Sequence, residues 1–438
     1  MTNISGVKKT MAYRFRIYPS KEQEAAFRRI SGCCRLVYNL ALEQRRDHWR
    51  RYRAKVGRHI SVVSQINELP ELKREVTFLK EVPSHTLQQA LKDLDRAYKN
   101  FFAGRADYPT PRKKRGGDSF RFPDPKQFQL TKGWLHAPKF GRSKSDFGAI
   151  RICQHRKVKG QIKTITIIRD GGHWYAAVST AREVTDPPEI KSGPRIVGID
   201  RGVTIPVALS TGEVFGAPTE GPGQRKRLAQ LQRSVARKVK GSANRRRAIA
   251  KLAAFKARQA RRRKDQLHKV SVQIVKNHDV IVLEDLKIEN MTRSARGTIE
   301  EPGKQVAQKA GLNREILDRG WGMFGAMLTY KAGWVGKRVI KVAPHHSSQE
   351  CSQCGNVATE NRASQATFAC TACGHAENAD LNAARVIRTR GIAILKAEGL
   401  SVSACGPSGV SPSVRQEETA GMPGGKDQTS STSCQPAT

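Results

Sequence analysis

Four cysteines in the C-terminal part of the chain have the spacing of a metal site. Cys351 and Cys354 form one Cys-x-x-Cys pair, and Cys370 and Cys373 form a second pair fifteen residues further on. This gap is typical of a four-cysteine zinc ribbon, and the glycine after each pair allows a tight backbone turn toward the sulfurs. The pattern predicts one structural Zn²⁺, against the alternative of a redox-active or accidental pair.

Three acidic residues stand where predicted strands end or a helix begins. Asp200 and Glu284 each close an apolar run, and Asp380 opens a helical segment just after the cysteines. Burying a carboxylate costs free energy unless a cation neutralises it. If the three acids converge, we therefore expect two Mg²⁺ or Mn²⁺ ions about 4 Å apart between them. Such ions activate water and stabilise the departing 3′ oxygen of a phosphodiester. An aspartate before Arg-Gly is also a common turn residue, which leaves a structural role open for Asp200.

The most basic stretch of the chain lies between Asp200 and Glu284. We expect two helices there, joined at Gly241-Ser242, and Asp265 is the only acid from Gly223 to Val270. A solvated helix face usually mixes both signs of charge, so this composition favours contact with nucleic-acid phosphates over simple solvent exposure. The residues expected at this contact are Arg225, Lys226, Arg227, Arg237, Lys238, Arg245, Arg246, Arg247, Arg261, Arg262 and Arg263.

The whole chain shares this charge. Its 438 residues carry a formal net charge of +41. Such an excess repels itself unless a polyanion neutralises it, so nucleic acid is the expected partner and an acidic membrane surface is the rival. No stretch approaches the roughly 18 to 20 consecutive apolar residues of a transmembrane helix, and the N-terminus lacks the apolar core of a secretory signal. We expect a cytoplasmic, nucleoid-associated protein with reduced thiols.

The periodicity of apolar residues predicts the elements that position these groups. Residues 13–17 alternate as in a strand, residues 21–104 have helical periodicity, and residues 105–189 return to strands with a hairpin at Gly171-Gly172. A helical insert therefore interrupts a β domain.

The second half of the chain is expected to hold an RNase H-like sheet. Its adjacent strands would end at Asp200 and Glu284, and the helix that begins at Asp380 would present the third acid. Residues 313–336 are expected to form one further helix. Its buried face would hold Leu317, Trp321, Phe324 and Leu328.

Several motifs in this order resemble the TnpB proteins of bacterial insertion sequences, formerly called OrfB transposases and related to type V CRISPR effectors. The resemblance covers nearly the whole chain. The motifs are YRFRIYP, GCCRLVYN, SFRF, GID at Asp200, LEDL at Glu284, YKAGWVG, HHSSQECSQCG, and NADLNAA after the cysteines. One departure is mild: the family's usual Tyr-Thr-Ser-Gln reads His346-Ser347-Ser348-Gln349 here, which keeps the hydroxyl.

The resemblance implies an RNA-guided DNA endonuclease of a mobile insertion sequence. Its partners would be a guide RNA from the transposon end, a double-stranded DNA target and, as a further candidate, a companion transposase. It implies an α/β multidomain fold. A wedge-like β domain, interrupted by a helical recognition lobe, comes first, and a RuvC-like nuclease domain follows it. The nuclease domain would contain Asp200, Glu284 and Asp380 and an inserted four-cysteine zinc ribbon. The expected divisions are 1–20 and 105–189 for the β domain, 21–104 for the helical lobe, 190–345 and 377–399 for the nuclease domain, 346–376 for the ribbon and 400–438 for a disordered tail.

Two other classes of function stay open. A transposase that joins strands without a guide could use the same metal–carboxylate site, because that site can present a 3′ hydroxyl instead of water. A DNA-binding regulator would have no catalytic activity, and acids that face phosphates would not increase its affinity for DNA. The intact set of three acids therefore argues against a regulator. The resemblance favours hydrolysis.

Overall fold

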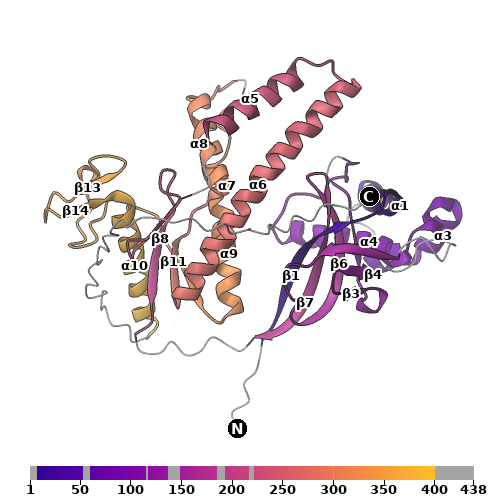
Figure 1. The fold of residues 1–438 in the computed structure, drawn as a ribbon, viewed down its shortest axis with the longest axis horizontal. Helices are drawn as coiled ribbons and strands as arrows, with labels where there is room; N and C mark the ends of the chain where they lie inside the picture. Colours follow the sequence, from indigo (N-terminus) through magenta and orange to yellow (C-terminus); the bar gives the residue numbers. More distant parts are fainter. Residues whose placement is uncertain are drawn as a thin grey trace, which may run out of the picture.

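In the computed structural model of this protein, two large sheets lie in separate parts of the molecule (Figure 1). The structure describes residues 7–52, 60–114, 117–136, 148–184, 193–216, 221–298 and 300–399. The tail expected over residues 400–438 lies outside the described residues. No helix in the described part of the chain is long and apolar enough to cross a membrane.

The first sheet has seven strands in the order β2-β6-β7-β1-β5-β4-β3, with every neighbouring pair antiparallel. The alternation predicted at residues 13–17 is confirmed, because Tyr13, Phe15 and Ile17 are all buried. The Gly171-Gly172 turn joins two long strands, as predicted. The strands are β1 Val7–Tyr18, β2 Ser119–Phe122, β3 Gln129–Thr131, β4 Trp134–His136, β5 Ala149–Cys153, β6 Gln161–Asp170 and β7 His173–Val184.

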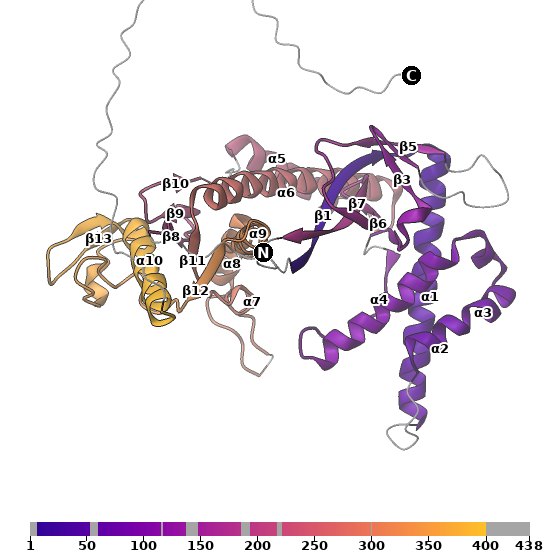
Figure 2. The ribbon, with the colours of Figure 1, turned by 90° about the horizontal axis from the view of Figure 1, so that it is seen from below.

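Helices between β1 and β2 form a lobe beside this sheet (Figure 2). Helix α1 buries Phe27 and Ile30 against the sheet residues Phe120 and Trp174. The helical elements of this half are α1 Lys21–Tyr52, α2 Val62–Asn67, α3 Leu69–Glu75, the 3-10 helix Thr77–Glu81, α4 Ser84–Phe102 and, between β2 and β3, the 3-10 helix Pro125–Gln127.

The second sheet has five strands in the order β10-β9-β8-β11-β12. Strand β11 pairs in parallel with both β8 and β12, and β9 runs antiparallel to β8 and β10. The strands that end in Asp200 and Glu284 are therefore neighbours, as the sequence predicts. The strands are β8 Ile196–Asp200, β9 Val207–Leu209, β10 Val214–Phe215, β11 Val280–Glu284 and β12 Arg338–Val342.

Helices cover both faces of this second sheet. Helix α10, Ala379–Ala397, packs Ile387 and Leu395 against one face, and α6 and α9 cover the other. Two glycines permit the close approach of α10: a Cβ at Gly198 would collide with the Ala384 carbonyl, and a Cβ at Gly391 would collide with Val282. The glycine before Ile199-Asp200 thus lets the last helix reach the strand that carries the first acid.

The basic stretch forms an arm of two helices that extends from the second sheet (Figure 1). Helix α5 spans Pro222–Ala236 and α6 spans Ala243–Asn277. Gly241 has a φ of +91°, and the Ser242 side chain accepts a hydrogen bond from the Arg245 amide, which caps α6. The predicted junction at Gly241-Ser242 is confirmed.

The single helix predicted over residues 313–336 is wrong. The structure has α8, Val306–Arg319, and α9, Trp321–Trp334, separated at Gly320 with a φ of +72°. This left-handed glycine ends α8 and turns the chain. Leu317 is therefore 57% exposed, whereas Trp321, Phe324 and Leu328 are buried as expected.

The remaining elements lie beside α8 and within the cysteine segment. They are α7 Ile288–Met291, the 3-10 helix Thr359–Asn361, β13 Thr367–Ala369 and β14 Ala376–Asn378.

Candidate active site and zinc ribbon

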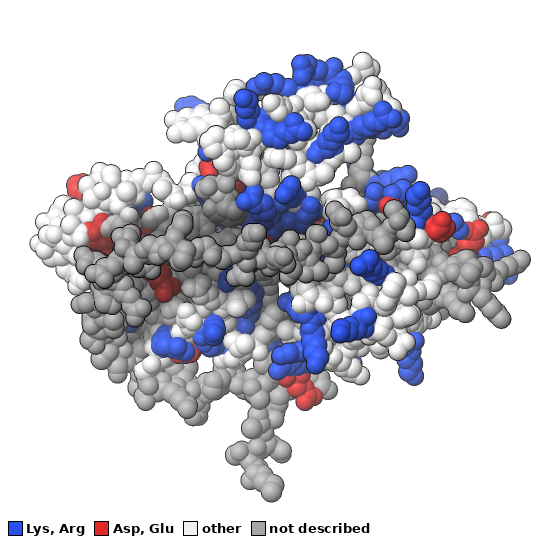
Figure 3. Space-filling model, in the orientation of Figure 1, with Lys and Arg blue, Asp and Glu red and all other residues white. Residues whose placement is uncertain are grey.

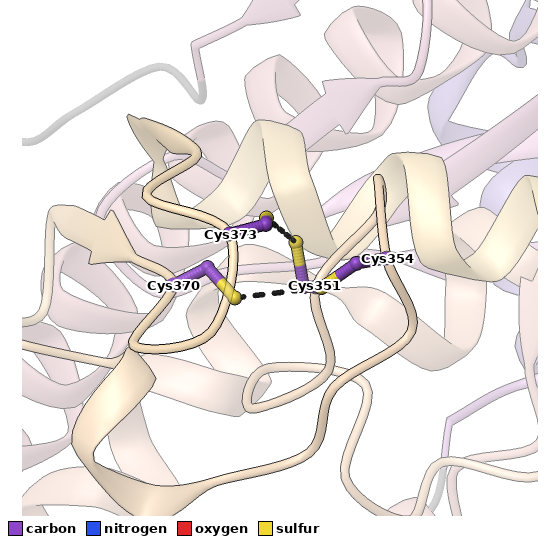
Figure 4. A group of neighbouring side chains, drawn as sticks. All are labelled: Cys351, Cys354, Cys370 and Cys373. Carbon is purple, nitrogen blue, oxygen red and sulfur yellow. Dashed lines mark hydrogen bonds between the residues drawn. The ribbon is translucent and has the colours of Figure 1, made fainter.

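The four predicted cysteine ligands lie together on two facing turns (Figure 4). The Sγ atoms of Cys351 and Cys373 are 3.7 Å apart, those of Cys354 and Cys370 are 3.6 Å apart, and all four sulfurs lie within 4.8 Å of one another. Four sulfurs that each lie about 2.3 Å from a tetrahedral zinc ion are roughly 3.8 Å from one another, close to the two observed distances. A disulfide would need sulfurs roughly 2 Å apart. The donor set fits zinc.

The two cysteine turns have matching backbone geometry. The Gly355 amide donates to the Cys351 carbonyl at 2.9 Å, and the Gly374 amide donates to the Cys370 carbonyl at 3.0 Å. Both glycines have positive φ angles, which side chains with a Cβ rarely adopt. Amide groups of the second turn, first that of Cys373, lower the pKa of the Cys370 thiol, whereas hydrogen bonds with the neighbouring thiols, first that of Cys354, raise the pKa of Cys373. The crowded sulfurs therefore titrate together.

The three predicted acids converge from three separate segments. Asp200 and Glu284 end the adjacent parallel strands β8 and β11, and Asp380 lies in the first turn of α10. Burial raises the pKa of Asp200 to about 7, and the charges of Glu284 and Asp380 add to this effect. Burial also raises the pKa of Asp380. Glu284 and Asp380 therefore lie close enough to Asp200 to oppose its ionisation.

A cavity of about 220 Å³ opens beside these acids. Asp200 and Asp380 line it, together with Ser347, Arg362 and Gln365. The charge of Arg362, which belongs to the ribbon, opposes the rise in the pKa of Asp380. The cavity thus combines oxygen donors for a cation with a guanidinium that can bind a phosphate.

Buried hydrogen bonds hold the strand ends in place. The Ser347 hydroxyl donates to Glu284 Oε1 at 2.6 Å, and the Arg201 guanidinium donates to the Glu284 backbone carbonyl at 2.6 Å. Ser347 and Arg201 are 6% and 7% exposed. Sequence reasoning missed both roles, and also that of Arg362. The adjacency of Arg201 to Asp200 and the retained hydroxyl at Ser347 were the only available signals.

The Asn-Ala-Asp-Leu-Asn run joins the acid site to the ribbon. The Asn378 side chain accepts from the amides of Asp380 and Leu381 and so caps α10. Asn382 is fully buried, donates to the Glu350 carbonyl at 2.8 Å and accepts from the Ser352 amide at 3.0 Å. The first cysteine turn is therefore fixed to the helix that carries Asp380.

The predicted nucleic-acid residues all lie on the arm, and Figure 3 shows Lys and Arg gathered over it. Arg245 donates to the carbonyls of Val235 and Lys238 at the end of α5, and Arg263 donates to Asp318. Arg245 thus ties α6 to the end of α5, Arg263 ties the arm to α8, and Lys238 is bonded to Ser234. The exposed members of the set are Arg225, Lys226, Arg227, Arg237, Arg246, Arg247, Arg261 and Arg262.

Three family models match parts of the chain. A model described as "Probable transposase" matches residues 179–295, and one described as "Cas12f1-like, TNB domain" matches residues 321–387. A third, described as "Helix-turn-helix domain", matches residues 9–54. In the described part of that range the structure has strand β1 and the single helix α1.

Two relatives align over nearly the whole chain. "Putative RNA-guided DNA endonuclease InsQ" of Escherichia coli K12 is 39% identical over 89% of this chain and 94% of its own length. "Putative RNA-guided DNA endonuclease" of Streptomyces pristinaespiralis is 35% identical over 94% of this chain and 98% of its own length.

A solved structure shares the fold. The cryo-EM structure of a Cas12f1–sgRNA–target DNA complex contains a protein chain that is 15% identical, with a TM-score of 0.52. The similarity covers 87% of this chain and 99% of that one. With the α/β fold, the cysteine cluster and these relatives in agreement, the chain belongs to the TnpB (OrfB) family, which is related to Cas12f.

Proposed function

We propose that this protein is an RNA-guided DNA endonuclease of a mobile insertion sequence, which hydrolyses phosphodiesters at Asp200, Glu284 and Asp380. The observation that carries the proposal is the convergence of these acids beside a cavity, where burial, with the charges of Glu284 and Asp380, raises the pKa of Asp200 to about 7. The names of the two long relatives support the same activity.

The acids fit a pair of hard divalent cations. Carboxylate oxygens are the ligands that Mg²⁺ and Mn²⁺ prefer, and a cluster that resists ionisation is stabilised when such ions bind. Two Mg²⁺ or Mn²⁺ ions held by Asp200, Glu284 and Asp380 would supply an activated water and stabilise the leaving 3′ oxygen.

Three side chains around the acids would position the groups that take part in the reaction. Ser347 fixes one oxygen of Glu284 and leaves the other free for a cation. Arg201 holds the backbone at the end of β11 and so fixes the spacing between the two strand ends. Arg362 lines the cavity, where its guanidinium can bind a nonbridging phosphate oxygen and stabilise the charge that develops in the transition state.

The cysteine segment is proposed to hold one structural Zn²⁺. Zinc would fix both cysteine turns. The two hydrogen bonds of Asn382 would then hold the helix that carries Asp380 in a fixed position relative to the first turn. The ribbon would thus support the acid site as well as present Arg362 to it.

We propose that the other elements hold nucleic acid. The first sheet would be a wedge-like domain, helices α1 to α4 a recognition lobe for guide RNA and target duplex, and the exposed cations of the arm a contact for phosphates. A companion transposase is a further candidate partner, and association with the nucleoid is expected from the charge of +41. The proposed divisions are those given by the sequence: 1–20 and 105–189, 21–104, 190–345 and 377–399, and 346–376.

The test is a guide exchange. Protein purified with its bound RNA should cut a DNA duplex that matches the guide, and a new guide segment should move the mapped cuts to the new site. Asp200→Ala, Glu284→Ala or Asp380→Ala should abolish cleavage and keep binding. Asp285→Asn is the matched control, because Asp285 adjoins Glu284 but pairs with Lys287 and Lys341.

Each contrary result selects an alternative. Cuts that stay in place after the exchange, or equal cleavage by RNA-free protein, would favour a transposase that acts without a guide. Sequence-specific binding with no metal-dependent cleavage would favour a regulator.

A further inference from the structure

Four aromatic side chains form a cluster at the C-terminal end of α4. The ring centroid of Phe101 lies 5.3 Å from those of both Phe102 and Tyr108, and that of Tyr98 lies 5.6 Å from that of Tyr108. Phe102 is 78% exposed and Tyr108 is 43% exposed. Exposed rings that contact one another form a contiguous apolar patch, whereas a single exposed apolar side chain is common on protein surfaces.

Hydrogen bonds hold the two tyrosines of this cluster and the segment that follows them. The hydroxyls of Tyr98 and Tyr108 are 2.9 Å apart. The Asn39 side chain donates to the Arg112 carbonyl at 3.1 Å and accepts from the Arg112 amide at 2.7 Å, which fixes the segment after the cluster to α1. A ligand would therefore meet a surface that is already ordered, at little entropic cost.

The surroundings of the cluster are cationic. Residues 96–114 contain six Lys or Arg and one acid, Asp107. Two acids of the preceding turn form ion pairs here, Asp95 with Lys99 and Asp93 with Arg112, so the cations still outnumber the acids. The Arg45 guanidinium lies 5.2 Å from the Tyr98 ring centroid. Protein interfaces are depleted in lysine, whereas aromatic rings among cations are typical of surfaces that bind single-stranded nucleic acid.

The position of the cluster agrees with such a ligand. Figure 2 shows the C-terminal end of α4 pointing away from α1, toward the part of the molecule that contains α7 and α8. The end of α4 that carries Phe102 therefore points toward the half of the molecule that contains the three acids.

We propose that Phe102, supported by Phe101 and Tyr108, stacks on an unpaired nucleobase of single-stranded RNA or DNA. The exposed cations Lys99 and Arg105 would bind the flanking phosphates. This deepens the proposed function by naming a subsite on the helical lobe, but it requires neither a guide nor cleavage.

The test is a photochemical crosslink on the full-length protein. Single-stranded oligonucleotides of roughly 12 nucleotides, RNA with 5-iodouridine or DNA with 5-iododeoxyuridine, are irradiated in complex with the protein and digested with trypsin. The adduct is expected on residues 100–105, the tryptic peptide that contains both phenylalanines. Phe102→Ala should lower its yield at an oligonucleotide concentration that does not saturate the wild type. Phe78→Ala, at another exposed phenylalanine of the same lobe, should not.

Salt dependence separates stacking from charge. The oligonucleotide concentration that half-saturates this adduct should rise roughly five- to 150-fold in Phe102→Ala, as for the loss of one base stack. Its dependence on log salt should keep the same slope, because every phosphate stays bound to its cation. Phe102→Trp should restore binding, and Arg105→Gln should flatten the slope.

Two results would overturn the proposal. One is a wild-type protein with no adduct on residues 100–105. The other is an adduct that Phe102→Ala leaves unchanged. If the same variant also converts a dimer into monomers in mass photometry, the patch binds a second copy of the chain.

Discussion

Replacing Asp200 by asparagine should stabilise the protein when no divalent cation is bound at the acids. Burial, with the charges of Glu284 and Asp380, raises the pKa of Asp200 from 3.8 to about 7. Below about pH 4 the carboxyl is protonated in the folded and the unfolded state. Between pH 4 and 7 only the unfolded state releases the proton, so stability falls as pH rises through this window and stays low above it.

The size of the effect follows from the two pKa values. A change from 3.8 to about 7, at about 1.4 kcal/mol for each pKa unit, corresponds to roughly 4 kcal/mol at pH 8. Asparagine is neutral at every pH and avoids this cost while it keeps the shape of the side chain. The gain in the free energy of unfolding should therefore approach roughly 4 kcal/mol at pH 8 and vanish near pH 4.

The assay is scanning calorimetry of both proteins, from pH 4 to 8, in buffer freed of Mg²⁺ but without a chelator that would strip zinc. The melting temperature of Asp200→Asn should exceed that of the wild type at pH 8, and added Mg²⁺ should narrow the difference because it binds the wild-type acids. Asp285→Asn, which loses ion pairs with lysines instead, should show no gain. A gain equal at pH 4 and pH 8, or a loss at pH 8, would refute the electrostatic argument.

Three further outcomes are expected. Elemental analysis should find one zinc per chain in the wild type and none in Cys373→Ser, and zinc-free wild-type protein would contradict the ribbon assignment. Asn382→Ala should keep its zinc but need more Mg²⁺ for half-maximal cleavage, because the helix with Asp380 loses two bonds to the ribbon; an unchanged Mg²⁺ titration would count against this coupling. Arg246→Gln should flatten the dependence of log affinity on log salt by up to about 0.9 for each duplex phosphate that the arm no longer neutralises, whereas Arg245→Gln should mainly lower the melting temperature, since Arg245 holds the end of α5. Equal salt slopes in these two variants would show that the arm does not bind DNA as proposed.

Local patterns predicted much of the fold. Apolar alternation identified β1, short apolar runs identified β8 and β11, and Gly241-Ser242 gave the junction of the arm, because each depends on neighbours in sequence. The same reasoning failed at Gly320. Helical periodicity continues through that residue, and it outweighed the local stop signal of a glycine directly after Arg319, where the left-handed turn separates α8 from α9.

The candidate site was less predictable from the sequence. The cysteine spacing and the acids at strand ends were visible, but the bond from Ser347 to Glu284 spans 63 positions and depends on the packing of β11 against the first residues of the ribbon. Charge counts likewise treat all arginines alike. Only the structure separates Arg245, which is engaged within the arm, from Arg246, which is exposed.

The order of the acids along the chain has a consequence for protein synthesis. Asp200 and Glu284 emerge from the ribosome long before α10, and Asp380 completes the site only when the last described helix packs against β8. The first sheet and the helices α1 to α4 are synthesised before any part of the acid cluster. A nascent or prematurely terminated chain that ends before Asp380 would therefore carry the surfaces proposed to bind nucleic acid without the complete set of acids proposed to cut it.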